Sequence, residues 1–358
     1  MSTLQKSERS RRLLIVLAHG RRMPSATVRA LIFLDHMAAA GYSVTTLDHY
    51  SDLDRVVRGF NRIYPRFSEW RIPRVAAQSD VVFLCKVVSP VLIGRIRAQA
   101  PRARIVLDFG DAMWLHSKQG VGKFGEMLGL VDIVTTDNEY TASYVRRFNQ
   151  NCLVVPDCPQ IESFDQRRPY LAKPDDGRVV LGWVGSPSTT YNLYAVWEAL
   201  EQLFEHYPQL ELRLVGADPR LLPPFEKVRF TLLKNYDQRR MIDEVLGMHI
   251  GLFPLQNTEA CRVRGILKST VYMSGGAVSA CSAIGEACDL IKDGINGVLA
   301  SNTAEWVEKV GRLVEDARTR ESIAQAGLAT VRAKYTITNS FRQLLRAFDR
   351  TGIEKGRC

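Results

Sequence analysis

The sequence predicts an α/β protein built from two doubly wound, Rossmann-like domains in tandem. Three observations support this fold class: a length of 358 residues, short β-branched runs that alternate with longer helical stretches, and one polar linker near the middle. Single cores rarely grow beyond about 250–300 residues, and this alternation is typical of parallel sheets covered by helices. Apolar residues make up 46% and charged residues 24% of the chain, which is an ordinary globular mixture.

The first half of the chain contains a series of short apolar runs that we expect to be strands. Between the first two runs, Ser25–Ala40 should form a helix that ends at Gly41, because glycine is common just after a helix. The expected strands are Leu13–Ala18, Ser43–Asp48, Val81–Cys85, Ile105–Asp108, Ile133–Thr135 and Leu153–Val155.

A linker and a second α/β series follow. The segment Pro156–Gly177 is polar and rich in proline, which marks it as the linker. We therefore expect one domain over 1–160 and another over 161–336, with a last helix over about 337–350 that returns to the first domain. The elements expected in the second domain are strands Val179–Val184, Leu210–Val215, Val228–Leu232, Ile250–Pro254 and Ala277–Ala280, and helices Tyr191–Tyr207, Gln238–Leu246 and Ala304–Glu315.

Doubly wound sheets bind their ligands beyond the carboxyl ends of the strands. Two such domains facing each other would therefore enclose a central cleft. The most informative segments should be the loops that follow the strands.

The formal net charge of +10 is unevenly distributed, since residues 1–74 hold 13 Lys and Arg against 6 Asp and Glu. Such a surface suits an anionic substrate, an anionic membrane or nucleic acid, and it can equally be a solvated basic face. No nucleic-acid-binding motif accompanies the charge, so we expect no nucleic-acid partner. Cations and aromatic residues alternate in one stretch, which suits peripheral contact with a membrane as well as a solvated helix and loop: Phe60, Arg62, Tyr64, Arg66, Phe67, Trp70, Arg71 and Arg74.

Other sequence features bear on location and on metals. No apolar run is long enough to span a bilayer, and we read no export signal. We therefore expect a cytoplasmic protein, and the basic stretch is also compatible with peripheral binding to the inner face of the membrane. The seven cysteines lack CxxC spacing and the six histidines lack metal-ligand spacing. We expect no metal site and no cofactor.

A possible phosphate-binding loop follows the strand at Val179–Val184. The run Leu181–Thr189 reads LGWVGSPST, with Gly185 and Ser186 where the strand ends and a long helix is expected. Glycine lets backbone N–H groups approach an anion, and a helix start adds partial positive charge. The alternative is a tight turn in which Ser or Thr caps the helix.

A second candidate anion site lies in the run Arg262–Lys268. We expect a helix that starts near Arg264 and stops at Gly275, which would place Arg264 and Lys268 on one helical face. Two cations near a helix N-terminus repel each other and the helix dipole unless an anion compensates them, and a diphosphate would do so. Cations in solvent are the alternative. A further loop of small residues, at 282–291, offers backbone amides for sugar hydroxyls.

Together, in this order and spacing, these segments resemble the retaining glycosyltransferases of family 4, which have the GT-B fold of two Rossmann-like domains around a cleft. The likeness is strongest over 179–335, where GWVGSPST, GLFPL, RVRGILKSTVYMSGGAV and IKDGINGVLA follow the family pattern, as does the final helical stretch. It is looser in the first half, where GRRMPSATVRA looks like the family's first loop and helix and LDFGDAMW looks like an acidic segment lining the cleft.

The resemblance implies a nucleotide-sugar donor bound by the second domain and an acceptor bound by the first, the acceptor being a glycan, a lipid-linked glycan or a small molecule. It also implies retention of configuration without a metal. By position, the residues that would stabilise the diphosphate or touch the reacting sugar are Arg264, Lys268, Asp111 and His116. Those that would contact the donor are Gly20, Gly185, Ser186, Arg262, Gly285, Glu286, Ala287 and Cys288.

One departure from the family pattern leaves two other functions open. Many members carry two glutamates eight positions apart, and Val263 and Val271 stand at those positions here. A valine side chain cannot hydrogen-bond to a ribose, so a catalytically silent subunit that binds a nucleotide sugar or a partner protein is one alternative. A sugar-nucleotide epimerase of the same fold is another, although the sequence shows no acid and base set for it.

Overall fold

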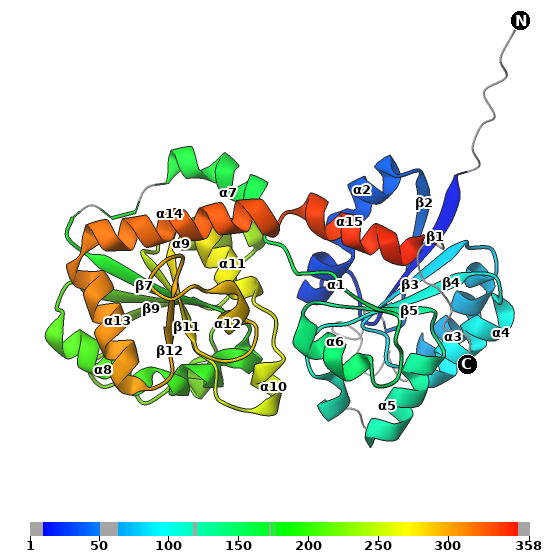
Figure 1. Ribbon diagram of the computed structural model, residues 1–358, viewed down its shortest axis with the longest axis horizontal. Helices are drawn as coiled ribbons and strands as arrows, with labels where there is room; N and C mark the ends of the chain where they lie inside the picture. The colour runs from blue at the N-terminus through cyan, green and yellow to red at the C-terminus, as the bar shows by residue number, and fades with distance from the viewer. Residues whose placement is uncertain (1–9, 51–63, 117–119, 172, 175, 350–358) are drawn as a thin grey trace, which may run out of the picture. The chain divides into compact units, whose positions relative to one another are not determined.

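The computed structural model describes residues 10–50, 64–116, 120–171, 173–174 and 176–349. The chain forms two compact units (Figure 1): unit 1 comprises Met1–Asp157 and Ile337–Cys358, and unit 2 comprises Cys158–Thr336. The sequence placed the first boundary between residues 160 and 161, within the stretch that connects the two sheets. Among the described residues, no helix is long and apolar enough to cross a membrane.

Unit 1 contains a six-stranded sheet in which every neighbouring pair of strands is parallel. The strand order is β2–β1–β3–β4–β5–β6, which is a doubly wound order. The strands are β1 (Arg11–Leu17), β2 (Tyr42–Asp48), β3 (Val81–Cys85), β4 (Arg104–Asp108), β5 (Ile133–Thr136) and β6 (Cys152–Val154). β3 is completely buried, as expected for a parallel strand covered on both faces.

The helices of unit 1 connect these strands. They are α1 (Pro24–Arg29), η1 (Leu31–Phe33), α2 (Leu34–Ala39), α3 (Tyr64–Ala76), α4 (Pro90–Gln99), η4 (Met113–His116), α5 (Gly120–Gly129) and α6 (Glu139–Val145). The continuous helix expected over Ser25–Ala40 is wrong, because Ala30 leaves helical geometry at φ −135°. The break follows Arg29, whose buried guanidinium is held by residues of other elements.

The last helix of the chain, α15 (Ile337–Phe348), belongs to unit 1 and covers part of its sheet (Figure 1). It is strongly amphipathic, and its buried face carries Phe341 and Phe348. Phe348 packs edge-on against Phe83 of β3, with 5.5 Å between the ring centres. The Ser340 hydroxyl donates a hydrogen bond of 2.8 Å to the Pro156 carbonyl, which fixes the first turn of the helix near the end of β6.

Unit 2 contains a second six-stranded parallel sheet, with strand order β12–β11–β10–β7–β8–β9. If β7 is counted as strand 1 and the list is read from β9 to β12, this is the order 3-2-1-4-5-6 that is typical of dinucleotide-binding sheets. The strands are β7 (Val179–Val184), β8 (Leu210–Val215), β9 (Phe230–Leu233), β10 (Ile250–Phe253), β11 (Val278–Ser282) and β12 (Val298–Ala300). The short strand β12 was not expected from the sequence.

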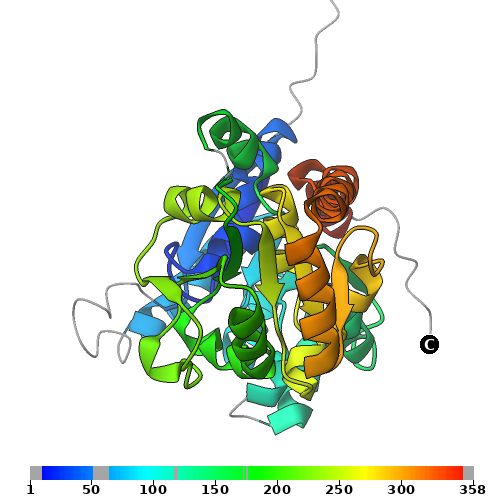
Figure 2. The ribbon, with the colours of Figure 1, turned by 90° about the vertical axis from the view of Figure 1, so that its left-hand side faces the viewer.

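The core of unit 2 lies on both faces of this sheet. In β7, Leu181 and Trp183 join one apolar cluster while Val180 and Val184 join the other. The helices that cover the two faces are visible in Figure 2. The helices of unit 2 are α7 (Ile161–Arg167), η5 (Arg168–Tyr170), η6 (Pro187–Ala195), α8 (Trp197–His206), η7 (Pro219–Leu221), α9 (Gln238–Leu246), α10 (Glu259–Arg262), α11 (Leu267–Ser274), α12 (Ala287–Leu290), α13 (Thr303–Glu315) and α14 (Ala317–Lys334).

Candidate functional site

Each sheet has a point at which the strand order reverses, and ligands of doubly wound folds bind beyond the strand ends there. In unit 2 this point lies between β7 and β10, so the loop after β7 and the turn before α11 border it. In unit 1 it lies between β1 and β3, and the residues just beyond these strands are joined by a hydrogen bond from Ala18 N to the Cys85 carbonyl. The candidate site residues predicted from the sequence follow these strand ends.

In unit 2, Lys268 from the first turn of α11 reaches the loop after β7. Its Nζ lies 3.3 Å from the Thr189 hydroxyl and 4.6 Å from the centre of the Trp183 ring. A side-chain carbon added at Gly185 would lie 2.9 Å from the same Nζ, so only glycine lets the lysine come this close. The Ser186 hydroxyl is 3.4 Å from that of Thr189, and it is exposed. The structure therefore brings three of the sequence-predicted residues together.

The charge of Lys268 is poorly compensated. Burial, followed by repulsion from the Arg264 guanidinium, lowers the pKa of Lys268 to about 7. The Nε of Arg264 is buried without a hydrogen-bond partner. Within the described part of the chain, neither cation has a carboxylate within ion-pair distance. An anion bound here would relieve both the repulsion and the unpaired donor.

The expectation that Arg264 and Lys268 share a helical face is wrong, because α11 begins only at Leu267. The chain leaves α10 at Arg262 and reaches α11 through an irregular turn. The Glu286 carboxylate accepts a hydrogen bond of 2.9 Å from the Ile266 N–H, just where the helix starts. This side chain from a later loop fixes the start of α11. Arg264 and Lys268 therefore repel each other across the turn before the helix and not along a helical face.

The loop after β11 packs directly on the segment that carries Arg262. Gly285 has φ +56°, and a Cβ there would lie 2.2 Å from the Arg262 carbonyl oxygen. Arg262 itself donates a hydrogen bond of 2.8 Å from Nε to the Asn257 side chain. Ala287 and Cys288 are the first two residues of the short helix α12. Ala287 is buried and Cys288 is exposed. The two loops that the sequence assigned to the donor thus form one packed surface.

In unit 1, two residues just beyond strands β3 and β4 adopt backbone conformations that favour glycine. Lys86 has φ +56° and Asp111 has φ +64°. Their side chains form an ion pair with 2.8 Å between Lys86 Nζ and Asp111 Oδ2. Burial opposes the charge of Lys86, but the Asp111 carboxylate raises its pKa. Strained non-glycine residues cluster at functional sites because the surrounding structure must hold them in place.

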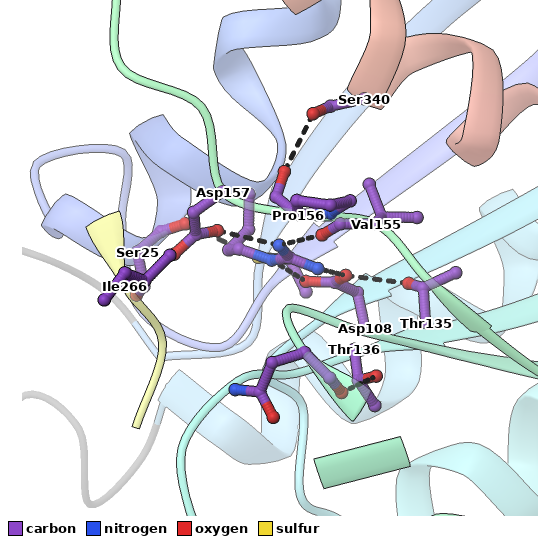
Figure 3. Close-up of polar contacts among 12 residues, drawn as sticks. Ser25, Asp108, Thr135, Thr136, Val155, Pro156, Asp157, Ile266 and Ser340 are labelled. Carbon is purple, nitrogen blue, oxygen red and sulfur yellow. Dashed lines mark hydrogen bonds and ion pairs between the residues drawn. The ribbon is translucent and has the colours of Figure 1, made fainter. Parts of the chain in front are cut away.

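Unit 1 also contains a buried network centred on Arg29, whose partners Asp108, Val155 and Asp157 are labelled in Figure 3. The guanidinium donates to both Asp108 oxygens, at 2.6 and 3.1 Å, and Nη1 donates to the Val155 carbonyl and to Asp157 at 2.6 and 2.7 Å. Thr135 donates a further hydrogen bond of 2.7 Å to Asp108. One buried cation thus joins β4, the segment just after β6 and the end of α1.

Asp137, just beyond β5, adds a carboxylate to this network without a cation of its own. Its side chain is almost fully buried, and Oδ1 has no hydrogen-bond partner among the described residues. Burial and repulsion from Asp157 raise the pKa of Asp137 to about 8. A raised pKa favours the protonated form, in which this carboxyl can donate a hydrogen bond at the strand ends.

The remaining predicted residues of unit 1 are less well defined. Gly20 is buried beyond β1, and its carbonyl accepts a hydrogen bond of 3.1 Å from Met23 N in the turn before α1. His116 is the last residue of η4, and its side chain lies outside the described residues. Within the described ranges, no group of three or more His, Cys, Asp or Glu side chains could hold a metal ion.

Comparison with solved structures places this architecture among known proteins. The chain superposes on the Anabaena protein Alr3699/HepE in complex with UDP-glucose with a TM-score of 0.67 and 12% identity, over 93% of this chain and 98% of that one. A glycosyltransferase from Rickettsia africae ESF-5 gives 0.69 and 12%, over 94% and 98%. An α,α-trehalose-phosphate synthase (UDP-forming) from Burkholderia vietnamiensis gives 0.68 and 12%, over 95% and 99%.

The chain has the GT-B fold. This confirms the fold class predicted from the sequence. No protein-family model matches the sequence, and a search of curated proteins finds no significant match. At 12% identity the structural likeness establishes the fold alone, so the function is argued from the side chains.

Sequence reasoning missed Lys86, Asp137 and the Arg29 network. For Lys86 and Asp137 a signal was present, because each lies one or two residues past an expected strand, where ligands of this fold bind. For Arg29 there was none. It lay inside an expected continuous helix, and its partners Asp108 and Asp157 are 79 and 128 residues away in the sequence.

Proposed function

We propose that this protein is a glycosyltransferase that takes a sugar from a nucleoside-diphosphate sugar. The observation that carries the proposal is the uncompensated pair Lys268 and Arg264 beside the glycine turn of Gly185, at the strand-order reversal of unit 2. Phosphates bind readily where backbone N–H groups and cations converge. Structures that share the fold include one protein in complex with UDP-glucose and with UDP, which supports a nucleotide-sugar donor.

In this proposal the cations act on the leaving group. Negative charge grows on the diphosphate as the glycosidic bond breaks, and fixed donors aimed at that charge lower the barrier. Lys268 and Arg264 supply such donors, with Ser186 and the backbone near Gly185 completing the cradle, and Arg262 and the 285–288 loop contact the rest of the donor. Unit 1 binds the acceptor, with Asp111 near the reacting sugar.

We assign the protein to retaining family 4 on its sequence motifs, and the mechanism follows from that assignment. The acceptor hydroxyl attacks the face that the diphosphate leaves, and the departing phosphate oxygen takes its proton. No divalent metal takes part. Proton NMR of the first product, with and without chelator, tests both statements: an inverted anomeric centre contradicts retention, and activity lost to chelator but restored by magnesium contradicts metal independence.

The function is tested most directly by a ligand screen followed by an assay for transfer. A ligand that binds only the native state raises its apparent stability by RT ln(1 + [L]/Kd), about 2.7 kcal/mol at 100 times Kd. Nucleotides and nucleotide sugars should raise the melting temperature, and the best donor should then be hydrolysed or transferred to a hydroxyl acceptor. Absence of any nucleotide-dependent shift in the folded protein would refute the proposal.

A catalytically silent subunit is the second candidate, and two residues favour it. Val263 is nearly buried and Val271 packs against the apolar cluster beneath α11. Neither offers a hydrogen bond where many family members present a glutamate. A silent subunit would bind a nucleotide sugar or a partner protein without turnover, so binding in the screen combined with inertness toward every donor and acceptor would decide for it.

We also propose that α3 of unit 1 contacts an anionic membrane surface, which would suit a lipid-linked acceptor. Phe67 and Trp70 are 49% and 54% exposed and stack on each other at 6.0 Å. Arg71 and Arg74 share this exposed side, and the Arg74 guanidinium lies 4.1 Å from the centre of the Trp70 ring. The predicted Phe60 and Arg62, and the side chain of Arg66, lie outside the described residues.

Each cation near an anionic surface contributes about 1 kcal/mol, and salt screens the attraction. Co-sedimentation with vesicles tests the contact. Binding should require anionic lipid, fall with salt and weaken in Trp70→Ala. Equal partitioning onto neutral and anionic vesicles, or none at low salt, would leave α3 as a solvated helix.

A further inference from the structure

A second group of cations lies at the other end of α11 from Lys268. Arg168, Lys173 and Arg320 line a cavity of about 350 Å³ within unit 2, together with Gly276, His249 and Glu321. The helix α11 has eight residues, so roughly 12 Å of helix separates the two ends. None of these residues belongs to the candidate donor site.

Backbone carbonyls at two helix ends hold these cations in place. Arg168 donates to the Ser274 carbonyl at 2.6 Å, and Lys173 donates to that of Gly276, both at the end of α11. Arg320 donates to the Leu313 carbonyl at 2.6 Å, near the end of α13. Helix C-termini carry partial negative charge that stabilises cations. These bonds use only part of the donor capacity, since a lysine has three N–H donors and an arginine five.

The positive charge of the cavity exceeds its negative charge. Glu321 is the one carboxylate among the cavity's described lining residues, and Asp165, 3.5 Å from Arg168, pairs more closely with Arg332 at 2.7 Å. The Nε of Arg168 is buried without a hydrogen-bond partner. Burial, with repulsion from Arg320 and Arg168, lowers the pKa of Lys173 to about 8.

His249 does not add to this charge. Its Nδ1 accepts a hydrogen bond of 3.0 Å from the Val180 N–H, so that nitrogen carries no proton. Burial, with repulsion from Lys173, lowers the pKa of His249 to about 4. The imidazole is therefore neutral at physiological pH, and the cavity presents three cations against one lining carboxylate.

We propose that this cavity is a second anion site, which binds a small ligand bearing a phosphoryl group through Arg168, Lys173 and Arg320. Several N–H donors on different chain segments converge there, which matches the several oxygens of a tetrahedral anion. The volume lies at the small end of ligand pockets, which suits a phosphorylated small molecule. The bound anion satisfies the unpaired Arg168 donor and neutralises the mutual repulsion of the cations.

Titration of inorganic phosphate into the full chain by calorimetry, at constant ionic strength, tests the site. Lys173→Gln and Arg320→Gln should each weaken the binding at this site at least tenfold. Arg318→Gln is the matched control, because Arg318 lies two residues before Arg320 in the same helix, is exposed and does not line the cavity. It should leave the affinity unchanged.

Glu321→Gln distinguishes a binding site from a purely structural cluster. This variant keeps every bond between a cation and a carbonyl but removes the opposing charge, so it should bind phosphate several-fold more tightly. Lys268→Ala removes phosphate binding at the donor site and should leave this site intact. Unchanged affinity in Lys173→Gln and Glu321→Gln, or loss of all phosphate binding in Lys268→Ala, would overturn the proposal.

Discussion

The strand ends of the two units handle charge in opposite ways. In unit 1 the buried guanidinium of Arg29 is shared between Asp108 and Asp157, and Asp137 is a further carboxyl group near them. In unit 2 Lys268 and Arg264 lie close together with no carboxylate partner among the described residues. The same sheet architecture thus supports a self-contained ionic network in one unit and an incomplete one in the other.

This difference separates structural charge from charge kept for a ligand. A buried ion pair whose donors and acceptors are satisfied contributes to the folded state and leaves little for a ligand. A buried cation without a partner costs free energy until an anion arrives. Unit 2 is therefore the unit to which we assign the anionic donor. The surplus group in unit 1 is a carboxyl whose raised pKa favours the neutral form, which can donate a hydrogen bond to a hydroxyl.

The largest effect should follow from removing the cation of unit 1. Arg29→Met leaves Asp108 and Asp157 buried without their partner, which typically costs about 3–5 kcal/mol of folding stability. Urea unfolding followed by circular dichroism measures this loss. Arg97→Met, which removes a partly exposed pair with Asp132, is the control and should cost less than about 1 kcal/mol. Equal losses in the two variants would mean that the Arg29 network is not the structural centre of unit 1.

The next effect concerns the loop that packs on the donor side of unit 2. Gly285→Ala combines a left-handed backbone with a Cβ 2.2 Å from the Arg262 carbonyl oxygen. We therefore expect the free energy of unfolding to fall by roughly 2–3 kcal/mol. Gly294→Ala is a close match, because Gly294 has φ +71° with open space around it, and should cost about 1 kcal/mol. Thermal unfolding gives both values. If the two variants are equally stable, the contact with Arg262 carries no constraint.

The sequence predicted the architecture better than the site because strands and helices leave local signals. The buried runs at β3, β7 and β8 start and end where the apolar pattern does, and α9 follows its capping aspartate Asp237. The start of α11 depends instead on Glu286, a residue 20 positions beyond the N–H it binds. No local pattern could show that contact, so the helix was placed too early.

The candidate site was predictable where one segment supplies it and not where several converge. Gly185, Ser186 and Lys268 stand in recognisable runs, and the fold brings them together as neighbouring strands align. The balance of positive and negative side chains around these residues could not be predicted from the sequence. Whether a lysine is paired depends on carboxylates from anywhere in the chain, and that is settled only in three dimensions.

A smaller effect is expected on ligand affinity in unit 2. Lys268→Ala should weaken binding of a nucleoside-diphosphate sugar at least tenfold, about 1.4 kcal/mol, because one of two cations is lost. Arg318→Gln is the control, since Arg318 is exposed in α14 and is not one of the candidate donor-site residues, and it should leave the affinity unchanged. Calorimetry measures both. Unchanged affinity in a folded Lys268→Ala protein would remove the lysine from the donor site.

The pH dependence of that affinity sharpens the same test. In the protein without ligand, burial lowers the pKa of Lys268 to about 7, so its side chain loses its charge as pH rises through neutrality. Affinity of the wild type for the nucleotide sugar should therefore fall between pH 6 and pH 8. Lys268→Arg keeps its charge over this range and should show a flatter profile. Identical profiles would mean that the protonation of Lys268 does not govern binding.

The last effect should come from Asp137, and the pH dependence it gives to stability has the opposite sign to that of an ordinary ion-paired aspartate. Because the pKa is raised to about 8 in the folded state, the native carboxyl keeps a proton that the unfolded chain loses near pH 4. The unfolded state then binds fewer protons over this window, so the stability of the wild type falls as pH rises from about 4 to about 8.

Asp137→Asn resembles the protonated carboxyl but does not titrate, so it should gain stability relative to the wild type as pH rises, by up to about 1.4 kcal/mol for each pH unit between pH 5 and pH 7. Urea unfolding at several pH values measures the difference. Asp35→Asn removes an exposed carboxylate of α2 and serves as the control. A wild type and an Asp137→Asn variant with parallel pH profiles would show that Asp137 is charged at neutral pH. The negative charge of Asp137 would then need a cation from a ligand to balance it. The two units would differ in the charge of the ligand that each binds, a cation in unit 1 and an anion in unit 2.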